Sequence, residues 1–483
     1  MNASQAMQFD LVVIGSGPGG YKAATGAARL GASVGLIERS LDGGSCLNEG
    51  CIPSDALLHP ASLIDDVRAL AGHGLTGTLT GDFGAAARRK NAVVAAMRAG
   101  VPLALKRLGI RHSRGTARFE SAHRVRVDPT DRDGEALVLE APRVIVATGS
   151  QPRALPQCPF DGATVLSSRE LYASLERLPE RVLIVGGGAV GVETAYLASQ
   201  FGARVTLVEG AARLLPGSRV PEHAADLLEA RLERLGVEVR TRTAPAGCTV
   251  REGRARVAFD DGSDGEYGLV LVAVGRTASS AGLGLAAAGV ATTPEGAIRT
   301  DAYLETDAQG VYAIGDVRAG PMTANAALYD AKVVVANALA GERVPANYHK
   351  VPFVVRSALE IATIGFTEEQ AEQAGFTPRA ARTGFVSSGK ARARHDPEGF
   401  IEVVHDVETG QLLGGCVVGP HAGEQILLLG AACQSPRGLW LFKDLSYSHP
   451  SWAEEIETAI DPCAVALART AEHLFRPGIH AQG

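Results

Sequence analysis

The sequence has no long apolar run, little cysteine and no marked excess of charge of either sign. Its 483 residues include seven cysteines, and the formal net charge is −6. No apolar stretch is long enough to cross a bilayer, and no run of lysine or arginine indicates a nucleic-acid surface. So few cysteines in so long a chain exclude a secreted disulfide framework.

The start of the chain, MNASQAMQFDLVVIG, also lacks the basic segment of a secretory signal and passes directly into an apolar run. These absences predict a cytoplasmic enzyme with neither a membrane nor a nucleic acid as partner. In that setting a close pair of cysteines is expected to be catalytic rather than structural. Apolar residues make up 46% and charged residues 21%, as in ordinary globular proteins, and the length predicts roughly two to four domains.

Two segments share one pattern of apolar strand, glycine-rich turn, alanine-rich helix and second strand. They are FDLVVIGSGPGGYKAATGAARLGASVGLIE, residues 9–38, and RVLIVGGGAVGVETAYLASQFGARVTLVE, residues 181–209. Each contains G-x-G-x-x-G and ends on a glutamate 18 residues after the last glycine; these residues are Gly15, Gly17, Gly20 and Glu38, and Gly186, Gly188, Gly191 and Glu209. Such glycines let the backbone approach a pyrophosphate at a helix N-terminus, while the acid binds ribose hydroxyls. A glycine-rich turn without a ligand is the alternative, but two copies in full context predict two dinucleotide sites.

The rest of the chain completes a predicted α/β fold. Short apolar strands that end in glycine recur in PRVIVATGS (142–150), LVLVAVGRT (269–277) and GVYAIGDV (310–317). From Tyr348 onward, alternating stretches such as FIEVVHD indicate antiparallel strands mixed with helices. We therefore expect two Rossmann-like dinucleotide-binding domains plus a C-terminal α+β domain, with boundaries at 1–150, 151–275, 276–347 and 348–483.

The segment GGSCLNEGCIPSDALLH places Cys46 and Cys51 close together at the expected start of a helix. The two can form a disulfide if the intervening LNEG loops, which Gly50 helps. Cys51 opens the expected helix, with Pro53 in its first turn, and a helix N-terminus favours the thiolate. Two reduced core cysteines are the alternative. The other cysteines have no motif and are expected to be buried and inert; they are Cys158, Cys248, Cys416, Cys433 and Cys463.

With these residues identified, the chain resembles the class I pyridine nucleotide–disulfide oxidoreductases, and most closely the dihydrolipoamide dehydrogenases. The resemblance runs nearly end to end and rests on GSGPGG, GGSCLNEGCIPS, ATG at 147–149, GGGAVGVE, AVGR at 273–276, YAIGD at 312–316 and SYSHPSWAEE at 446–455. It implies FAD on the first dinucleotide fold (1–150 with 276–347), NAD(H) on the second (151–275), and a homodimer built by the last domain (348–483). It also implies that each active site is shared between two subunits.

The same resemblance implies roles for four catalytic residues. Cys51 would face the flavin, and Cys46 would exchange with a small dithiol or disulfide. His449, in SHPSWAEE, would be the acid and base for Cys46 from the other subunit, oriented by Glu454 five residues on. Without that motif, a histidine here would be expected to be an ordinary surface residue.

The cofactor contacts follow from the resemblance as well, and no metal site is expected. Those for FAD are Gly15, Gly17, Gly20, Glu38, Gly44, Ser45, Ala117, Thr148, Gly149, Asp316, Thr323 and Ala324. Those for NAD are Gly186, Gly188, Gly191, Glu193, Glu209 and Gly275. An acid at Glu209 favours an unmodified ribose, hence NADH over NADPH. Ala189 stands where many relatives have a larger residue, which indicates either a less gated nicotinamide pocket or a packing requirement.

The chain departs from the family beside the flavin. Relatives have a lysine at the position of Asp55, where it pairs near the flavin with the glutamate that matches Glu193. Two carboxylates about 4 Å apart at an effective dielectric constant of 20 would repel by roughly 4 kcal/mol. Either one carboxyl is protonated, or Asp55 turns elsewhere, including to solvent, and Glu193 has another partner. In PMTANAALYDA (321–331), Asn325 replaces the usual histidine and an acidic pair is lost; Leu359 stands where proline is usual.

The sequence thus predicts an FAD-dependent, NAD-linked dithiol/disulfide oxidoreductase, and the departures at the flavin indicate a specialised paralogue. Its substrate would be a small dithiol or disulfide, or a lipoyl-carrying protein, because the chain itself has no lipoyl-domain signature. Mercuric-ion reduction is a weaker alternative, since the tail HLFRPGIHAQG lacks the paired cysteines that capture mercury. A flavin-binding interaction subunit without turnover is the alternative outside the enzymes.

Overall fold

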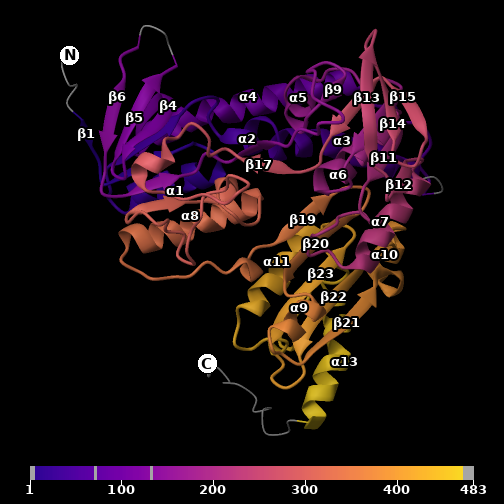
Figure 1. The fold of residues 1–483 in the computed structure, drawn as a ribbon. Coiled ribbons are helices and arrows are strands. Elements are labelled where there is room, and N and C mark those ends of the chain that lie inside the picture. The colour runs from indigo at the N-terminus through magenta and orange to yellow at the C-terminus, as the bar shows by residue number, and fades with distance from the viewer. Residues whose placement is uncertain (1–5, 70–72, 131–133, 471–483) are drawn as a thin grey trace. The chain divides into compact units, whose positions relative to one another are not determined.

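A computed structural model gives the fold of residues 6–69, 73–130 and 134–470 (Figure 1). The chain divides into two compact units. The first comprises Met1–Asp65, Leu79–Ala212 and Gly236–Asn347, and the second comprises Asp66–Thr78, Arg213–Leu235 and Tyr348–Gly483. The four boundaries predicted from the sequence remain a prediction. The C-terminal segment HLFRPGIHAQG, residues 473–483, contains no cysteine and lies outside the described residues.

The first sheet of unit one is built around the first glycine motif. Strand β2 (Leu11–Ile14) is fully buried and leads through the turn into helix α1 (Pro18–Arg29) and strand β3 (Val34–Glu38). A short run of buried aliphatic residues is typical of a parallel strand covered on both faces. The eight strands follow the order β1-β6-β5-β4-β3-β2-β7-β18. The others are β1 (Met7–Gln8), β4 (Arg111–Ser121), β5 (Arg124–Pro129), β6 (Leu137–Glu140), β7 (Val144–Val146) and β18 (Val311–Ala313).

From β4 to β18 this sheet is parallel, whereas β4, β5 and β6 form an antiparallel extension. Helix α8 (Ala324–Leu339) packs against α1 beside the sheet (Figure 1). Apart from α6, described next, the other helices that begin in unit one are α2 (Gly44–Asn48), α3 (Cys51–Ala69), α4 (Phe83–Arg107), α5 (Ser168–Ser174), η1 (Leu285–Ala288) and η2 (Gly315–Val317).

The second glycine motif builds a smaller parallel sheet in the same unit. Strand β10 (Arg181–Val185), helix α6 (Ala189–Gln200) and strand β11 (Arg204–Glu209) repeat the plan of the first motif. The five strands follow the order β12-β11-β10-β16-β9, all parallel, with β9 (Val165–Leu166), β12 (Glu238–Thr241) and β16 (Leu269–Val272). Beside it lie the antiparallel meander β13 (Pro245–Arg251), β14 (Arg254–Phe259) and β15 (Asp264–Tyr267), and the pair β8 (Ser150–Pro152) with β17 (Arg276–Ala278).

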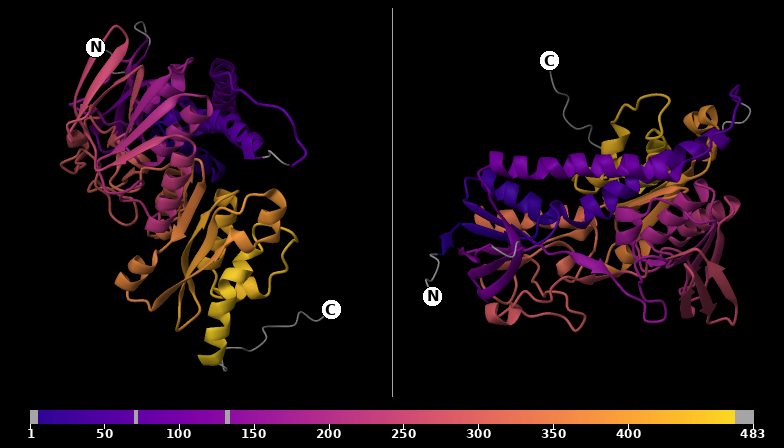
Figure 2. Two further views of the ribbon diagram at one scale, coloured as in Figure 1. Left: turned by 90° about the vertical axis from the view of Figure 1, so that its right-hand side faces the viewer. Right: turned by 90° about the horizontal axis from the view of Figure 1, so that it is seen from above.

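Unit two contains an antiparallel sheet with helices packed on it, as the alternating stretches predict (Figures 1 and 2). Its order is β19-β20-β23-β22-β21, with β19 (Phe353–Arg356), β20 (Glu360–Gly365), β21 (Pro378–Gly384), β22 (Phe400–Asp406) and β23 (Leu412–Val418). Helix α11 (Ala422–Cys433) packs on β20 and β23, and α13 (Glu455–Thr470) packs on β21 and β22. The other helices are α7 (Glu222–Arg234), α9 (Glu368–Gln373), α10 (Gly389–Arg394), α12 (Trp440–Lys443), η3 (Tyr348–Lys350) and η4 (Phe385–Ser387).

The architecture is therefore the predicted one, with two Rossmann-like folds followed by an α+β domain. Within the described ranges, none of the helices combines the length and the hydropathy that crossing a bilayer requires.

Candidate active site

A cavity of about 550 Å³ opens in unit one where the parallel strands of the first sheet end. Its lining includes Gly15 after β2, Glu38 at the end of β3, Ala147–Gly149 after β7, and Gly315 after β18. Carboxyl ends of parallel strands are where open α/β sheets bind their ligands. The size is also within the range of small-molecule and cofactor sites.

The first glycine turn is packed too closely against the backbone to carry side chains at two of its positions. Gly15 has φ of +104°, and a Cβ on Gly20 would lie 1.9 Å from the Gly15 carbonyl oxygen, so neither position accepts a side chain. The Glu38 carboxylate accepts hydrogen bonds from the backbone N–H and the hydroxyl of Ser16, each at 2.8 Å, and from the Ser40 N–H at 2.8 Å. The N-terminus of α1, which has no side-chain cap, fits the pyrophosphate of FAD, and the buried Glu38 carboxylate fits its ribose.

The second glycine turn has the same construction. Gly186 has φ of +110°, and a Cβ on Gly191 would lie 1.8 Å from the Gly186 carbonyl oxygen. The Glu209 carboxylate accepts from the backbone N–H groups of Gly187 and Ala211, each at 2.7 Å. Two strand ends with the same geometry therefore fit two dinucleotides.

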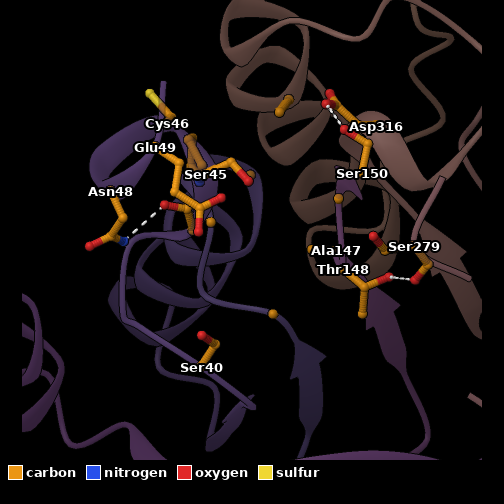
Figure 3. A pocket seen from close by; sticks show the side chains of 18 of the residues that line it. Ser40, Ser45, Cys46, Asn48, Glu49, Ala147, Thr148, Ser150, Ser279 and Asp316 are labelled. Atoms are coloured by element: carbon orange, nitrogen blue, oxygen red, sulfur yellow. Dashed lines mark hydrogen bonds between the residues drawn. The ribbon is translucent and has the colours of Figure 1, made fainter. Parts of the chain in front are cut away.

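Cys46 and Cys51 both line the cavity (Figure 3 labels Cys46). Cys46 lies in the short helix α2, and Cys51 is the first residue of α3. Both carry thiols in this structure. A hydrogen bond with the Cys51 side chain is the largest cause that raises the pKa of the Cys46 thiol, and burial adds to it. The helix N-terminus favours the thiolate at Cys51.

Across the cavity from Cys46, hydrogen bonds fix the wall that carries Ser150 and Asp316 (Figure 3). The Ser150 hydroxyl donates to the Asp316 carboxylate at 2.6 Å, and the Arg276 Nε donates to the Ser150 hydroxyl at 2.6 Å. The Thr148 hydroxyl donates to the Ser279 carbonyl at 2.8 Å. This network holds Asp316 in η2, directly after β18, where the sequence predicts the flavin-binding carboxylate.

The remaining predicted FAD residues divide between the cavity and its surroundings. Gly17, Gly44, Ser45, Ala117, Gly149 and Ala324 line the cavity. Thr323 is outside that lining and caps helix α8, with its hydroxyl accepting from the Ala326 N–H at 3.1 Å. Gly275, predicted to contact NAD, follows β16 with φ of +107°.

The two carboxylates at the departure from the family lie in different surroundings. Asp55 is exposed on α3, whereas Glu193 on α6 is half-buried. Burial is the largest cause that raises the pKa of the Tyr172 phenol, and the negative charge of nearby Glu193 is the second. The charge of Cys51 contributes too. The exposure of Asp55 is consistent with a side chain turned to solvent, the second of the two alternatives predicted above.

His449 and Glu454 lie together in unit two. The His449 Nδ1 and a Glu454 carboxylate oxygen are 2.9 Å apart, and the other Glu454 oxygen accepts from the Ser451 N–H at 3.2 Å. A carboxylate at Nδ1 places the proton on that nitrogen and leaves Nε2 able to accept a proton. The His449 side chain is 80% exposed, so Nε2 is accessible from outside this chain.

Three contacts around the cavity have no counterpart in the sequence predictions. The buried Lys90 ammonium donates to the carbonyl of Tyr172, which lines the cavity, at 2.5 Å. Arg169 pairs with Glu49 at 2.9 Å at the cavity wall. The buried Asp330 accepts from the Arg318 guanidinium at 3.0 Å, as described further below. Each joins residues without a shared motif, so nothing local in the sequence identifies them.

Two family matches cover most of the chain. Residues 9–331 match the family described as pyridine nucleotide-disulphide oxidoreductase, and residues 351–460 match its dimerisation domain. The chain belongs to the pyridine nucleotide–disulphide oxidoreductase family. The second match supports a homodimer.

Individual relatives agree with this assignment. The chain is 38% identical to a dihydrolipoyl dehydrogenase of Chlorobaculum parvum over 462 residues, covering 94% of this chain and 97% of the relative. It is 38% identical to a dihydrolipoyl dehydrogenase of Thermus scotoductus over 478 residues, covering 97% and 99%.

Solved structures give the same result. LpdA from Mycobacterium tuberculosis matches with a TM-score of 0.87 at 26% identity, covering 94% of this chain and 99% of that one. The HOCl-induced flavoprotein disulfide reductase RclA from Escherichia coli, in a Cu(II) complex, matches with a TM-score of 0.81 at 28% identity, covering 94% and 98%. The protein is thus an FAD-dependent, NAD-linked disulfide oxidoreductase of the lipoamide dehydrogenase type.

Proposed function

We propose that the protein passes electrons between NAD(H) and a small dithiol or disulfide, such as a lipoyl group, which reacts at Cys46 and Cys51. The observation that carries the proposal is that both cysteines line the same cavity as the first glycine turn and interact with each other. Bound FAD would supply the two-electron chemistry that links the nicotinamide to the thiol pair.

Because the pKa of the Cys46 thiol is raised, its deprotonation requires a base. Cys46 has a raised pKa because of its hydrogen bond with Cys51 and its burial, so it is a weak nucleophile until its proton is removed. His449, with Nδ1 held by Glu454, offers Nε2 for that proton. In the homodimer that we propose, the corresponding histidine of the second subunit would complete each active site.

We further propose that the protein is a specialised paralogue of the dihydrolipoyl dehydrogenases. The support is the carboxylate at Asp55, where the family has a cation, on the helix that begins at Cys51. Loss of a positive charge near the ring system would disfavour the anionic form of the reduced cofactor. Asp55→Lys should therefore raise the flavin reduction potential and speed reduction by NADH, and unchanged values for both would contradict the proposed effect of Asp55.

The function is tested by steady-state reduction of NAD⁺ with dihydrolipoamide, using FAD-loaded protein. Cys46→Ser should abolish turnover, and Glu454→Gln should lower kcat roughly a hundredfold with little change in KM, because the base loses its orienting carboxylate. Cys433→Ser, at a thiol of α11 in unit two, is the matched control and should be unchanged.

Full activity in Cys46→Ser would overturn the proposal. Bound FAD with no turnover of any dithiol would favour the interaction-subunit alternative. NADH-dependent reduction of Hg(II) without dithiol turnover would favour the metal-ion alternative.

A further inference from the structure

Cys158 and Cys248 lie outside the cavity, in the nucleotide-binding part of unit one. Cys158 ends the turn that begins at Leu155, with its N–H donating to the Leu155 carbonyl at 2.9 Å. Cys248 lies on β13, paired with Val257 of β14. The two cysteines are 90 residues apart in the sequence, and neither lines the cavity of Cys46 and Cys51.

The fold places these two side chains in the same apolar cluster. Cys158 belongs to a buried apolar cluster between the parallel sheet and the meander, and Cys248 packs against the same cluster. They are near enough that the Cys248 thiol, after burial, contributes to raising the pKa of Cys158. The sequence predicted that the cysteines without a motif are buried and inert, and the expected burial was wrong for Cys248 and Cys433, which are half-buried.

Solvent reaches only one of these two thiols. Cys158 is 0% exposed, whereas Cys248 is partly exposed on β13, an edge strand of its sheet. The register of β13 shifts between Pro245 and Gly247, immediately before Cys248, and the space where Gly247 would carry a Cβ is open. Bulges of this kind redirect neighbouring side chains and interrupt pairing at sheet edges. A small reagent can thus reach Cys248 but not Cys158.

We propose that Cys158 and Cys248 are a second redox-active thiol pair, which is oxidised to a disulfide by small disulfides in solution. The Cys248 thiolate attacks one sulfur of the small disulfide RSSR, forming a mixed disulfide and releasing RS⁻. The Cys158 thiolate then attacks the Cys248 sulfur and releases the second RS⁻. The two protein thiols are oxidised, the two RS⁻ take up the two protons, and RSSR is reduced to two RSH.

The surroundings fit this order of events. Burial, followed by the hydrogen bond with Cys248 and the charge of Asp161, raises the pKa of Cys158. Cys158 is therefore the poorer first nucleophile and acts as the resolving thiol. The Asp161 carboxylate is fixed nearby by the N–H groups of Ala163, Thr164 and Val165, each at 2.8 Å.

The test uses the full FAD-loaded protein and oxidised glutathione as the small disulfide. After incubation under native conditions, remaining thiols are alkylated and the protein is digested without reduction for mass spectrometry. A peptide pair linked through Cys158 and Cys248 is expected in the wild-type protein and in Cys433→Ser, whose half-buried thiol serves as the matched control. Cys158→Ser should stop at a mixed disulfide of Cys248 with glutathione, and Cys248→Ser should leave Cys158 unmodified.

Two results would overturn the proposal. One is a wild-type protein in which both thiols remain alkylatable. The other is a wild-type Cys248 that keeps glutathione without passing on to Cys158, since the two thiols would then not act as a pair. Because neither residue lines the cavity, Cys158→Ser and Cys248→Ser should both retain dithiol turnover, which separates this test from that of the proposed function.

Discussion

His405 lies inside the antiparallel sheet of unit two, where its side chain is 1% exposed. Burial is the largest cause that lowers the pKa of this imidazole below its ordinary value of 6.5, followed by the charge of Arg379 on the neighbouring strand. A hydrogen bond with the Arg379 backbone and the charges of Asp406 and Glu368 act in the opposite direction but do not outweigh burial. The folded protein therefore keeps His405 neutral at a pH where the unfolded chain would protonate it.

The sign of the resulting pH dependence follows from proton binding. Below about pH 6.5 the unfolded state binds a proton that the folded state does not, so the free energy of unfolding falls as the pH falls. The slope is up to about 1.4 kcal/mol per pH unit, until the folded-state imidazole also titrates. His405→Gln should lose less stability than the wild type between pH 7 and pH 5 in urea unfolding. His59→Gln, at an exposed residue of α3, is the control, and equal slopes in all three proteins would contradict the assignment.

At the scale of elements, α8 is tied to the turn that carries Asp316. Asp330 on α8 is 0% exposed; one of its oxygens accepts from the Gly315 N–H at 2.9 Å and from the Arg318 Nε at 3.0 Å. These contacts fix both ends of η2, with Asp316 between them. Helix α8 therefore positions Asp316, a cavity residue that belongs to η2 and not to α8.

Breaking this pair should loosen the cofactor site as well as the fold. Asp330→Asn removes the negative charge from a buried ion pair with Arg318, and breaking such a pair costs roughly 3–5 kcal/mol. We expect a lower thermal midpoint and faster release of FAD, followed by flavin fluorescence. The double variant with Arg318→Met should recover part of the midpoint, because no buried charge remains. A single variant with the wild-type midpoint and wild-type FAD retention would contradict the role of the pair.

At the scale of the molecule, we expect the two glycine turns to bind two different dinucleotides. A methyl group on Gly20 or Gly191 would meet a carbonyl oxygen at less than van der Waals distance, and such overpacking costs about 1–3 kcal/mol. Gly191→Ala should raise the KM for NADH about ten- to a hundredfold while FAD remains bound. Gly20→Ala should instead release FAD.

The controls for this prediction are alanines at glycines with room for a Cβ. Gly247→Ala has no heavy atom within 4 Å of the added carbon, and Gly26→Ala on α1 makes an ordinary contact at 3.7 Å with Val335. Both should keep FAD and the wild-type KM. Loss of FAD from Gly191→Ala, with NADH binding intact, would show that the two sites had been assigned the wrong way round.

Local patterns in the sequence predict much of this architecture but not its long-range contacts. The glycine motifs predict β2–α1–β3 and β10–α6–β11, because each motif contains its own strand, turn and helix. The alternating stretches after Tyr348 likewise predict an antiparallel sheet.

Contacts between distant residues could not be found in the same way. The tertiary fold joins Lys90 to Tyr172 and Arg318 to Asp330, and it places Cys158 and Cys248 in one cluster. None of these pairs is marked by spacing or composition. The same limit applies to Asp55, whose departure from the family is visible in the sequence, whereas its exposure on α3 is visible in the structure alone.

The central claim is that electrons from NADH reach the Cys46–Cys51 pair inside the cavity. The most direct measurement is an anaerobic titration of the oxidised, FAD-loaded protein with NADH, followed by alkylation and mass spectrometry of the peptide that contains both cysteines. We predict that NADH converts a linked Cys46–Cys51 peptide into one that is alkylated at Cys46, and that Gly191→Ala requires far more NADH for the same conversion. If the flavin is reduced while the two cysteines stay linked at every NADH concentration, the claim is contradicted.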